Sequence, residues 1–439
     1  MKIKHWTFAS SIIMSSFSIH AQERKHLDIE EVLHLAFTQS NQAKALDASV
    51  QTKQLQYEAA KDNYLPETKL SGTYLALNTP NIDLKINKSS SNNGGNTNGN
   101  GSEIAPNQLM LGQLSVNMPI YAGGKIRNSV KTAEDTWKAA ELNTVATKQN
   151  LSVQALHLYL ALYKAQQTTS LIAENIKKSE QQVKDFKAME ENGIIARNDL
   201  LKAELQLSNY KVSYQEAAKN VKVLNYQLTT LLGLGENVEL DDIKLSKALL
   251  SSNATEGNLK DRYEIKALEA QKNVAEDQIK VTKSAYKPTL FATAGYAAIN
   301  VPSVVTVTNA LNAGVGLSYD LGSLYKNKRK VNVAKQSLVE VERNLAVTED
   351  KIKNQIQEAQ QDVVLAKEKN KLHRQALDQA NENYRITKDK YNNGVADTDD
   401  LLTADVQQLQ SKISLAIGEA DLVESYYNLL LANGQLNIQ

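Results

Sequence analysis

Two long stretches without glycine or proline constrain the fold more than any other feature of the sequence. Glycine is absent between Gly124 and Gly193 and again between Gly322 and Gly394, and all six prolines lie outside both stretches. Because proline breaks a helix and glycine weakens it, each stretch of about 70 residues predicts one continuous helix. Each helix would be about 100 Å long. A compact globular domain has no room for such helices, so the sequence predicts an elongated protein.

Four shorter segments also have helical patterns: Asp28–Asn63, Asn198–Leu232, Asp261–Tyr286 and Thr398–Leu431. The second and the fourth repeat apolar residues at alternating spacings of three and four. This repeat is typical of a coiled-coil seam, and an ordinary amphipathic helix is the simpler alternative. Their length and the near-absence of helix breakers, with Gly418 the only one, favour the coiled coil.

The proline-containing regions predict β-strands at about 66–78, 109–121, 289–300 and 310–321. The second and fourth segments alternate apolar and polar residues, the pattern of a strand with one apolar face. That face either packs on helices or faces lipid, and the strands are long enough to cross a membrane. Four strands cannot close a barrel, and open edges are not tolerated in lipid, so a barrel would need several subunits.

The remaining segments have simpler readings. Residues 1–21 have the basic start, apolar stretch and small-residue end of a secretory signal peptide. The polar tract 88–102 joins two predicted strands, so we expect a long exposed hairpin loop. The chain has no cysteine, which excludes disulfides and zinc–thiolate sites, and its net charge of +1 argues against nucleic-acid binding.

The mature sequence is an internal duplication. Asn192-Gly193 matches Asn393-Gly394, and Asp199-Leu200-Leu201 matches Asp400-Leu401-Leu402 at the same offset. We therefore predict a first repeat at 22–232, a connecting segment at 233–260 and a second repeat at 261–439. Each repeat has the order helix, β-hairpin, long helix, tight turn, helix.

This duplicated order resembles the TolC-like outer-membrane factors, the outer membrane efflux protein family. The segment from Pro119 to Lys125, with Gly123 and Gly124, is similar to the family's strand-to-helix junction. Asn192-Gly193-Ile194 and Asn393-Gly394-Val395, each followed by an Asp-Leu-Leu motif, are similar to its helical tip turns. The second junction, at 321–325, departs from the pattern because it lacks the double glycine.

The resemblance implies a mainly helical fold with a β-barrel part. Such proteins are homotrimers with a 12-stranded barrel in outer-membrane lipid and a long periplasmic α-helical tunnel. The implied function is a passive exit duct that works with a periplasmic adaptor and an inner-membrane transporter in efflux or type I secretion. A periplasmic coiled-coil adaptor or scaffold without a barrel is the alternative.

The resemblance also indicates where the duct would be narrow. In the family, acids at the helical tip line the periplasmic entrance. Here Asp400 is the acid of the Asp-Leu-Leu motif that follows the second tip turn. We expect Asp397, Asp399 and Asp199 near the same constriction, with Tyr391 and Arg197 bracing the closed entrance. Helix capping is the competing role for these acids.

The tip turns are the expected contact with the adaptor, and their glycines are expected to adopt a left-handed conformation. We expect no catalytic, cofactor-binding or metal-binding site. The Gly-Gly-Lys at 123–125 lacks the spacing and the following Ser or Thr of a phosphate-binding loop. No Ser-His-Asp arrangement stands out, so the sequence favours a duct over an enzyme.

Overall fold

A computed structural model describes residues 23–78, 107–235, 238–243, 258–302 and 305–438. The chain divides into two compact units. The first contains Met1–Leu46, Val145–Asp261 and Ile352–Gln439, and the second contains Asp47–Thr144 and Arg262–Lys351. The predicted signal peptide and the polar tract at 88–102 lie outside the described residues.

The helices follow the pattern of glycine and proline. Both long helices are continuous, as predicted, because no breaker interrupts them: α3 spans Lys125–Glu191 and α6 spans Ser323–Asn392. The other α-helices are α1 (Ile29–Thr38), α2 (Asn41–Lys61), α4 (Arg197–Leu231), α5 (Tyr263–Lys283) and α7 (Thr398–Ala432). Short 3-10 turns lie at Asp62–Tyr64, Leu259–Asp261 and Ser284–Tyr286.

The prediction of a single helix over Asp28–Asn63 is wrong, because the helix is interrupted between α1 and α2. Ser40 is the reason: its Oγ accepts a hydrogen bond from the backbone N–H of Ala43 at 3.0 Å and donates to the carbonyl of Ala36 at 2.7 Å. A serine in this position caps the new helix. The break also makes room for Gly233, where an added Cβ would lie 2.8 Å from the carbonyl oxygen of Gln39.

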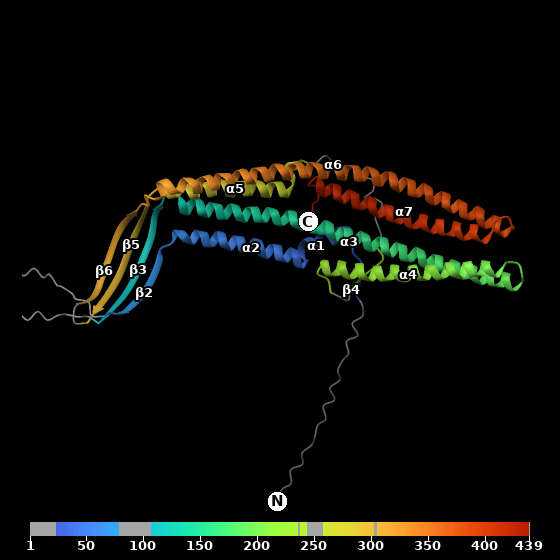
Figure 1. Cartoon of the computed structure of the whole chain (residues 1–439), viewed down its shortest axis with the longest axis horizontal. Coiled ribbons are helices and arrows are strands. Elements are labelled where there is room, and N and C mark those ends of the chain that lie inside the picture. The colour runs from blue at the N-terminus through green and yellow to red at the C-terminus, as the bar shows by residue number, and fades with distance from the viewer. Residues whose placement is uncertain (1–22, 79–106, 236–237, 244–257, 303–304, 439) are drawn as a thin grey trace, which may run out of the picture. The chain divides into compact units, whose positions relative to one another are not determined.

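The second unit contains an antiparallel sheet of four strands (Figure 1). Its order is β2 (Glu67–Ala76), β3 (Gln108–Ala122), β5 (Thr289–Val301) and β6 (Val305–Ser318). The register places Leu70, Leu114, Tyr296 and Leu311 in one row across the sheet, and the neighbouring row is Lys69, Ser115, Gly295 and Asn312. One face is therefore apolar and the other is small and polar, as the alternation predicts.

The last strand differs from its predicted bounds of 310–321. It begins at Val305 because backbone pairing with β5 continues that far, with Val305 opposite Val301 and Val307 opposite Ile299. A register shift between Ala297 and Ile299 interrupts that pairing, opposite Asn309, which has a positive φ of 61°. The strand ends at Ser318, since the chain then turns into α6.

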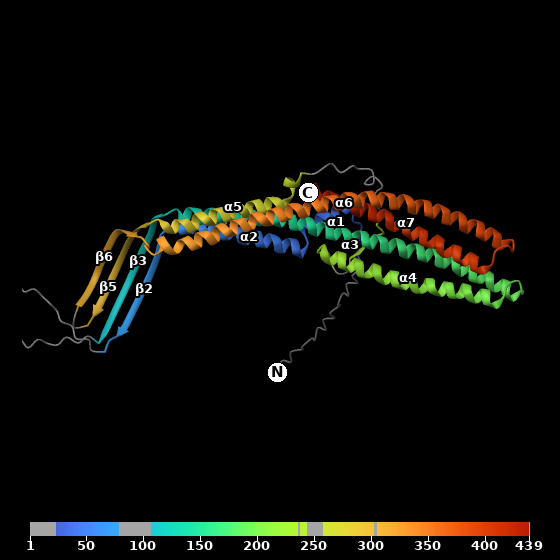
Figure 2. The same cartoon turned by 45° about the horizontal axis from the view of Figure 1, so that its top comes forward.

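The first unit is a helical bundle with one main core. In both views α4 runs beside α3, and α7 runs beside α6 (Figures 1 and 2). The core collects fully buried side chains such as Val32, Leu156, Leu160, Leu228 and Val423. A short parallel pair, β1 (Glu23–Lys25) with β4 (Val238–Leu240), lies at its edge. Across the described ranges, no helix has a stretch both long and apolar enough to cross a membrane.

Candidate functional site

The two tip turns have the same geometry, as their repeated sequence suggests. Gly193 and Gly394 both have φ of 71°, and an added Cβ at either would meet no atom within 4 Å. In each turn the residue after the glycine donates its N–H to a carbonyl five residues back, a Schellman-type ending. The side chains of Ile194 and Val395 are 67% and 73% exposed. Each turn therefore presents one apolar side chain to solvent.

Asparagine stabilises both turns. Asn192 Nδ2 donates to the carbonyl of Ala188 at 2.6 Å, and Asn393 Nδ2 donates to the carbonyl of Asp389 at 2.7 Å. Each of these carbonyls also accepts the backbone N–H of the same asparagine at 3.2 Å, so the amide adds a second hydrogen bond at the end of the helix. The asparagines thus have a structural role in ending α3 and α6.

The acids predicted for the constriction have different surroundings. Asp397 caps α7, because its Oδ1 accepts the N–H of Asp400 at 2.9 Å, and Asp400 Oδ2 accepts the N–H of Asp397 at 3.4 Å. This reciprocal capping box stabilises the start of the helix. Asp399 is 73% exposed and lies 3.8 Å from Lys202 Nζ. Asp199 lies in the first turn of α4 and makes no capping bond there.

The two predicted bracing residues are not joined to each other. Tyr391 stacks on Phe186 at a ring-centroid distance of 5.6 Å and packs in a cluster with Leu200 and Leu401. Its buried hydroxyl has no hydrogen-bond partner in the described part of the chain. Burial raises the pKa of Tyr391, and the charge of Asp199 adds to this shift. The guanidinium of Arg197 instead faces Glu190, with Nη1 4.0 Å from Oε1 of that residue.

A buried polar network near these turns was not predicted from the sequence. Asp405 of α7 is 1% exposed, and its Oδ2 accepts hydrogen bonds from Asn175 Nδ2 and the Tyr210 hydroxyl, both at 3.0 Å. Lys178 Nζ donates to Oδ1 and also lies 3.4 Å from the ring centroid of Tyr384. Four helices, α3, α4, α6 and α7, therefore meet around one carboxylate. Burial raises the pKa of Tyr210, and the negative charge of Asp405 raises it further.

One sequence signal points to this acid. Asp405 lies four residues after Leu401 and four before Leu409, on the buried stripe of α7. A charged residue in such a position needs a partner, since an unpaired buried charge is costly. The identity of that partner is not encoded locally, because Asn175, Lys178 and Tyr210 lie about 200 residues earlier in the chain.

The strand-to-helix junction lies in the second unit and depends on its glycines. Pro119 lies beside a register shift in the pairing of β3 with β5. Gly123 and Gly124 have φ of 64° and 86°. A Cβ on Gly123 would lie 2.7 Å from the carbonyl oxygen of Ser284, so only glycine allows this close approach.

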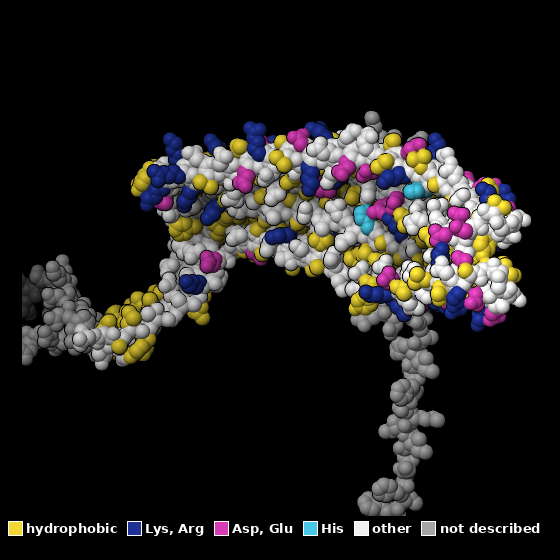
Figure 3. Space-filling model, turned by 45° about the vertical axis from the view of Figure 1, so that its right-hand side comes forward, with side chains coloured by type: hydrophobic (Ala, Val, Ile, Leu, Met, Phe, Trp, Pro, Cys, Tyr) yellow, Lys and Arg dark blue, Asp and Glu magenta, His cyan; other side chains and the backbone are white. Residues whose placement is uncertain are grey.

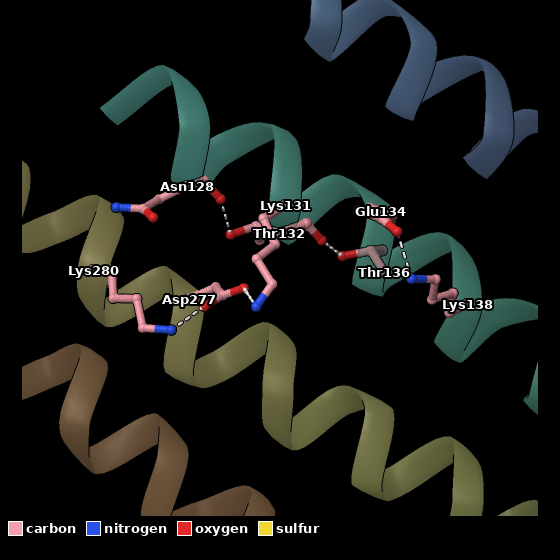
Figure 4. Close-up of polar contacts among 8 residues, drawn as sticks. All are labelled: Asn128, Lys131, Thr132, Glu134, Thr136, Lys138, Asp277 and Lys280. Atoms are coloured by element: carbon pink, nitrogen blue, oxygen red, sulfur yellow. Dashed lines mark hydrogen bonds and ion pairs between the residues drawn. The ribbon is translucent and has the colours of Figure 1, made fainter. Parts of the chain in front are cut away.

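Charged side chains join the start of α3 to α5 (Figure 4). Asp277 is 1% exposed, and its carboxylate accepts Lys280 Nζ while Lys131 Nζ lies at 3.4 Å. Although burial opposes ionisation, the two lysines lower the pKa of Asp277. The pKa of Asp135 is raised instead, because burial outweighs the opposing effect of Lys131.

These clusters have no arrangement suited to a metal. Within the described ranges, no group of three or more histidine or acidic side chains is placed to hold a metal ion.

A family model described as "Outer membrane efflux protein" matches residues 32–234 and 257–435. The chain belongs to the outer membrane efflux protein family. Outer membrane efflux protein BepC of Brucella suis biovar 1 (strain 1330) is 23% identical over 332 residues, which cover 74% of this chain and 72% of BepC.

Solved structures have the same fold. The CmeC outer membrane channel of Campylobacter jejuni matches with a TM-score of 0.76 at 16% identity, covering 100% of this chain and 94% of CmeC. The outer membrane protein VceC of Vibrio cholerae matches with a TM-score of 0.74 at 15% identity, covering 92% of this chain and 96% of VceC. The predicted fold class, a helical tunnel with a β-barrel part, is confirmed.

The family membership also confirms the predicted location. This protein lies in the outer membrane, and its helical part is on the periplasmic side. Members of the family are channels rather than enzymes. The roles of the individual tip residues remain predictions, as do the predicted domain boundaries.

Proposed function

We propose that three copies of this chain form a passive exit duct through the outer membrane. The observation that carries the proposal is the four-stranded sheet. It has one apolar face, and among the described residues no strand pairs with the outer edge of β2 or of β6. All neighbouring strands are antiparallel, so β2 and β6 run in opposite directions. Joining β6 of one copy to β2 of the next therefore continues the antiparallel pattern.

Closing the sheet supports a trimer in particular. A strand edge in lipid leaves backbone groups without hydrogen bonds, so a membrane sheet has to close on itself. Three copies of the four observed strands give twelve, which is within the range of natural outer-membrane barrels. Leu311 is 81% exposed on the apolar face and would be covered by lipid.

The duct would receive its cargo at the helical tips. We assign the two tip turns to contact with a periplasmic adaptor, because Ile194 and Val395 are exposed apolar side chains at the end of the helical hairpins. An inner-membrane transporter would supply the energy and select the cargo, either small molecules or proteins. Asp400 and Asp399 would lie around the entrance, where repeated carboxylates from three copies attract cations.

The proposal is tested on the detergent-purified mature protein. Electron microscopy is expected to show threefold particles, and planar bilayers are expected to show a conductance that divalent or trivalent cations block from one side. Monomeric particles without conductance would contradict the duct and favour a periplasmic scaffold. A variant with Ile194 and Val395 both replaced by Glu is expected to keep the conductance but lose binding to an adaptor protein.

A further inference from the structure

The start of α6 carries an unusual excess of positive charge. Between Ser323 and Val339 the sequence contains no acid, and the first acid of the helix is Glu340. Five cationic side chains fall in this stretch, and all five are exposed: Lys326, Lys328, Arg329, Lys330 and Lys335. The positive end of the helix dipole opposes a cation in the first turn, where Lys326 lies, and the closely spaced cations that follow repel one another. An anionic partner would offset both costs.

No described acid supplies that partner. None of the five cations forms an ion pair with the described part of the chain, and Lys326 lies only over the Tyr325 ring, 5.8 Å from its centroid. The nearby Asp320 is engaged by the N–H of Gly322 at 2.9 Å. Lys131 and Lys280 offer the contrast, since both are held by Asp277 (Figure 4).

Hydrogen bonds fix this stretch against the end of α5. Ser323 Oγ donates to the carbonyl of Ala285 at 2.7 Å, and Asn327 Nδ2 donates to the carbonyl of Thr282 at 2.8 Å. Two more exposed lysines lie at that end of α5. We call the combined surface the basic patch; it consists of Lys283, Lys287, Lys326, Lys328, Arg329 and Lys330.

The basic patch adjoins exposed apolar side chains. Leu321, Leu324 and Tyr325 are 65%, 51% and 71% exposed, and they directly follow the apolar face of β6 in the chain. Figure 3 shows Lys and Arg side chains gathered at the end of the helices nearest the sheet, with hydrophobic side chains beside them. Lysine, arginine and tyrosine next to aliphatic side chains are typical of the boundary between lipid tails and headgroups.

We propose that the basic patch binds anionic phospholipid headgroups in the membrane leaflet on the helical side of the sheet. The charges are complementary, and the surface continues directly from the apolar face that would meet the lipid tails. The other repeat supports this position, because α3 also begins with exposed cations, Lys125 and Arg127, and no acid in its first turn. The inference rests on the proposed membrane-spanning role of the sheet.

The test compares two lipids of equal chain length on the full-length protein in neutral detergent. Fluorescent phosphatidylglycerol and phosphatidylcholine are titrated, and the ratio of their dissociation constants is measured. The test variant is K326Q/K328Q/R329Q/K330Q. The matched control, K367Q/K369Q/K371Q/K388Q, removes the same charge from exposed lysines farther along α6. Circular dichroism and particle size verify that both variants fold and assemble.

Each cation near an anionic surface is worth roughly fivefold in affinity, so two cations acting on one headgroup give roughly 25-fold, and the variant is expected to bind phosphatidylglycerol at least tenfold more weakly. Phosphatidylcholine binding and the control variant should not change. Equal phosphatidylglycerol affinity in the test variant and the wild type would overturn the proposal. The proposal would also be overturned if the test variant changed the ratio of anion to cation permeability of the channel while its lipid affinity stayed the same. That result would place the cations in the lumen. Absent conductance with intact lipid preference would instead count against the duct alone.

Discussion

Replacing Asp405 with alanine should loosen the start of α7. The substitution removes the acceptor of Asn175 and Tyr210, whose side chains are buried, and of Lys178, which is 34% exposed. Each of the two buried donors left without a partner costs about 1–3 kcal/mol. Lys178 can turn to solvent or to Gln408, which already accepts its Nζ at 3.3 Å, so its loss adds little. We expect a total of about 3 kcal/mol.

Hydrogen exchange measures this cost locally. A loss of about 3 kcal/mol corresponds to roughly 100-fold faster opening of the amides around Asp405 in α7. Amides near Val423, in the main core of the first unit, serve as the internal reference because they share none of these contacts.

Two matched variants separate the network from the mere loss of charge. Tyr210→Phe removes one donor and leaves none unsatisfied, so about 0.5–1.5 kcal/mol and at most roughly tenfold faster exchange are expected. Asp399→Ala removes an exposed acid from the first turn of α7, whose ion-pair partner among the described residues is Lys202 at 3.8 Å in solvent, and should change exchange less than about twofold. If Asp405→Ala exchanged no faster than Asp399→Ala, the reasoning would be refuted.

Three further predictions concern the strand-to-helix junction, the loss of stability at acidic pH, and the acids at the tip. Gly124→Ala should cost about 1–2 kcal/mol from backbone strain, while Gly123→Ala should cost clearly more, because its Cβ meets a carbonyl oxygen at 2.7 Å; thermal unfolding compares them. The pKa of Asp277 is lowered, so its stabilisation is complete above about pH 4 and is lost as the pH falls through its folded pKa. Asp277→Asn should therefore flatten the fall in melting temperature below about pH 4, and a parallel fall would contradict this. Asp397→Ala should cost about 1 kcal/mol of helix stability and leave cation block intact, whereas Asp400→Ala should weaken cation block; equal block in both variants would make these acids only caps.

The sequence was sufficient for the regular elements because their causes are local. The absence of breakers determined α3 and α6, and period-two alternation determined which face of the sheet is apolar. Two bounds differ from the prediction. Ser40 caps a new helix within the first helical segment, which is a local cause, and β6 begins at Val305 because its pairing with β5 continues past a register shift, which depends on the partner strand.

The contacts of the site were harder to predict, because they join distant parts of the chain. Asp405 stands out as an acid on an apolar stripe, yet its three partners come from α3 and α4. Tyr391 stacks on Phe186 of α3, a contact that residue spacing does not predict, and its bracing of the entrance stays a prediction. The capping box at Asp397 and Asp400 follows from adjacent residues, so it was a predictable alternative.

The open edges of the sheet have a consequence for how the protein reaches its membrane. A lone chain presents β2 and β6 without outer neighbours, and lipid does not tolerate such edges. Insertion and association should therefore be one coupled step, with a rate that rises more steeply than linearly with chain concentration. A co-produced chain whose β6 edge is blocked by proline would still accept a neighbour at β2 and would stop ring closure. Such a chain should inhibit assembly even when it is less abundant than the normal chain. Assembly in the membrane, rather than transport, is then the step most sensitive to a defective subunit.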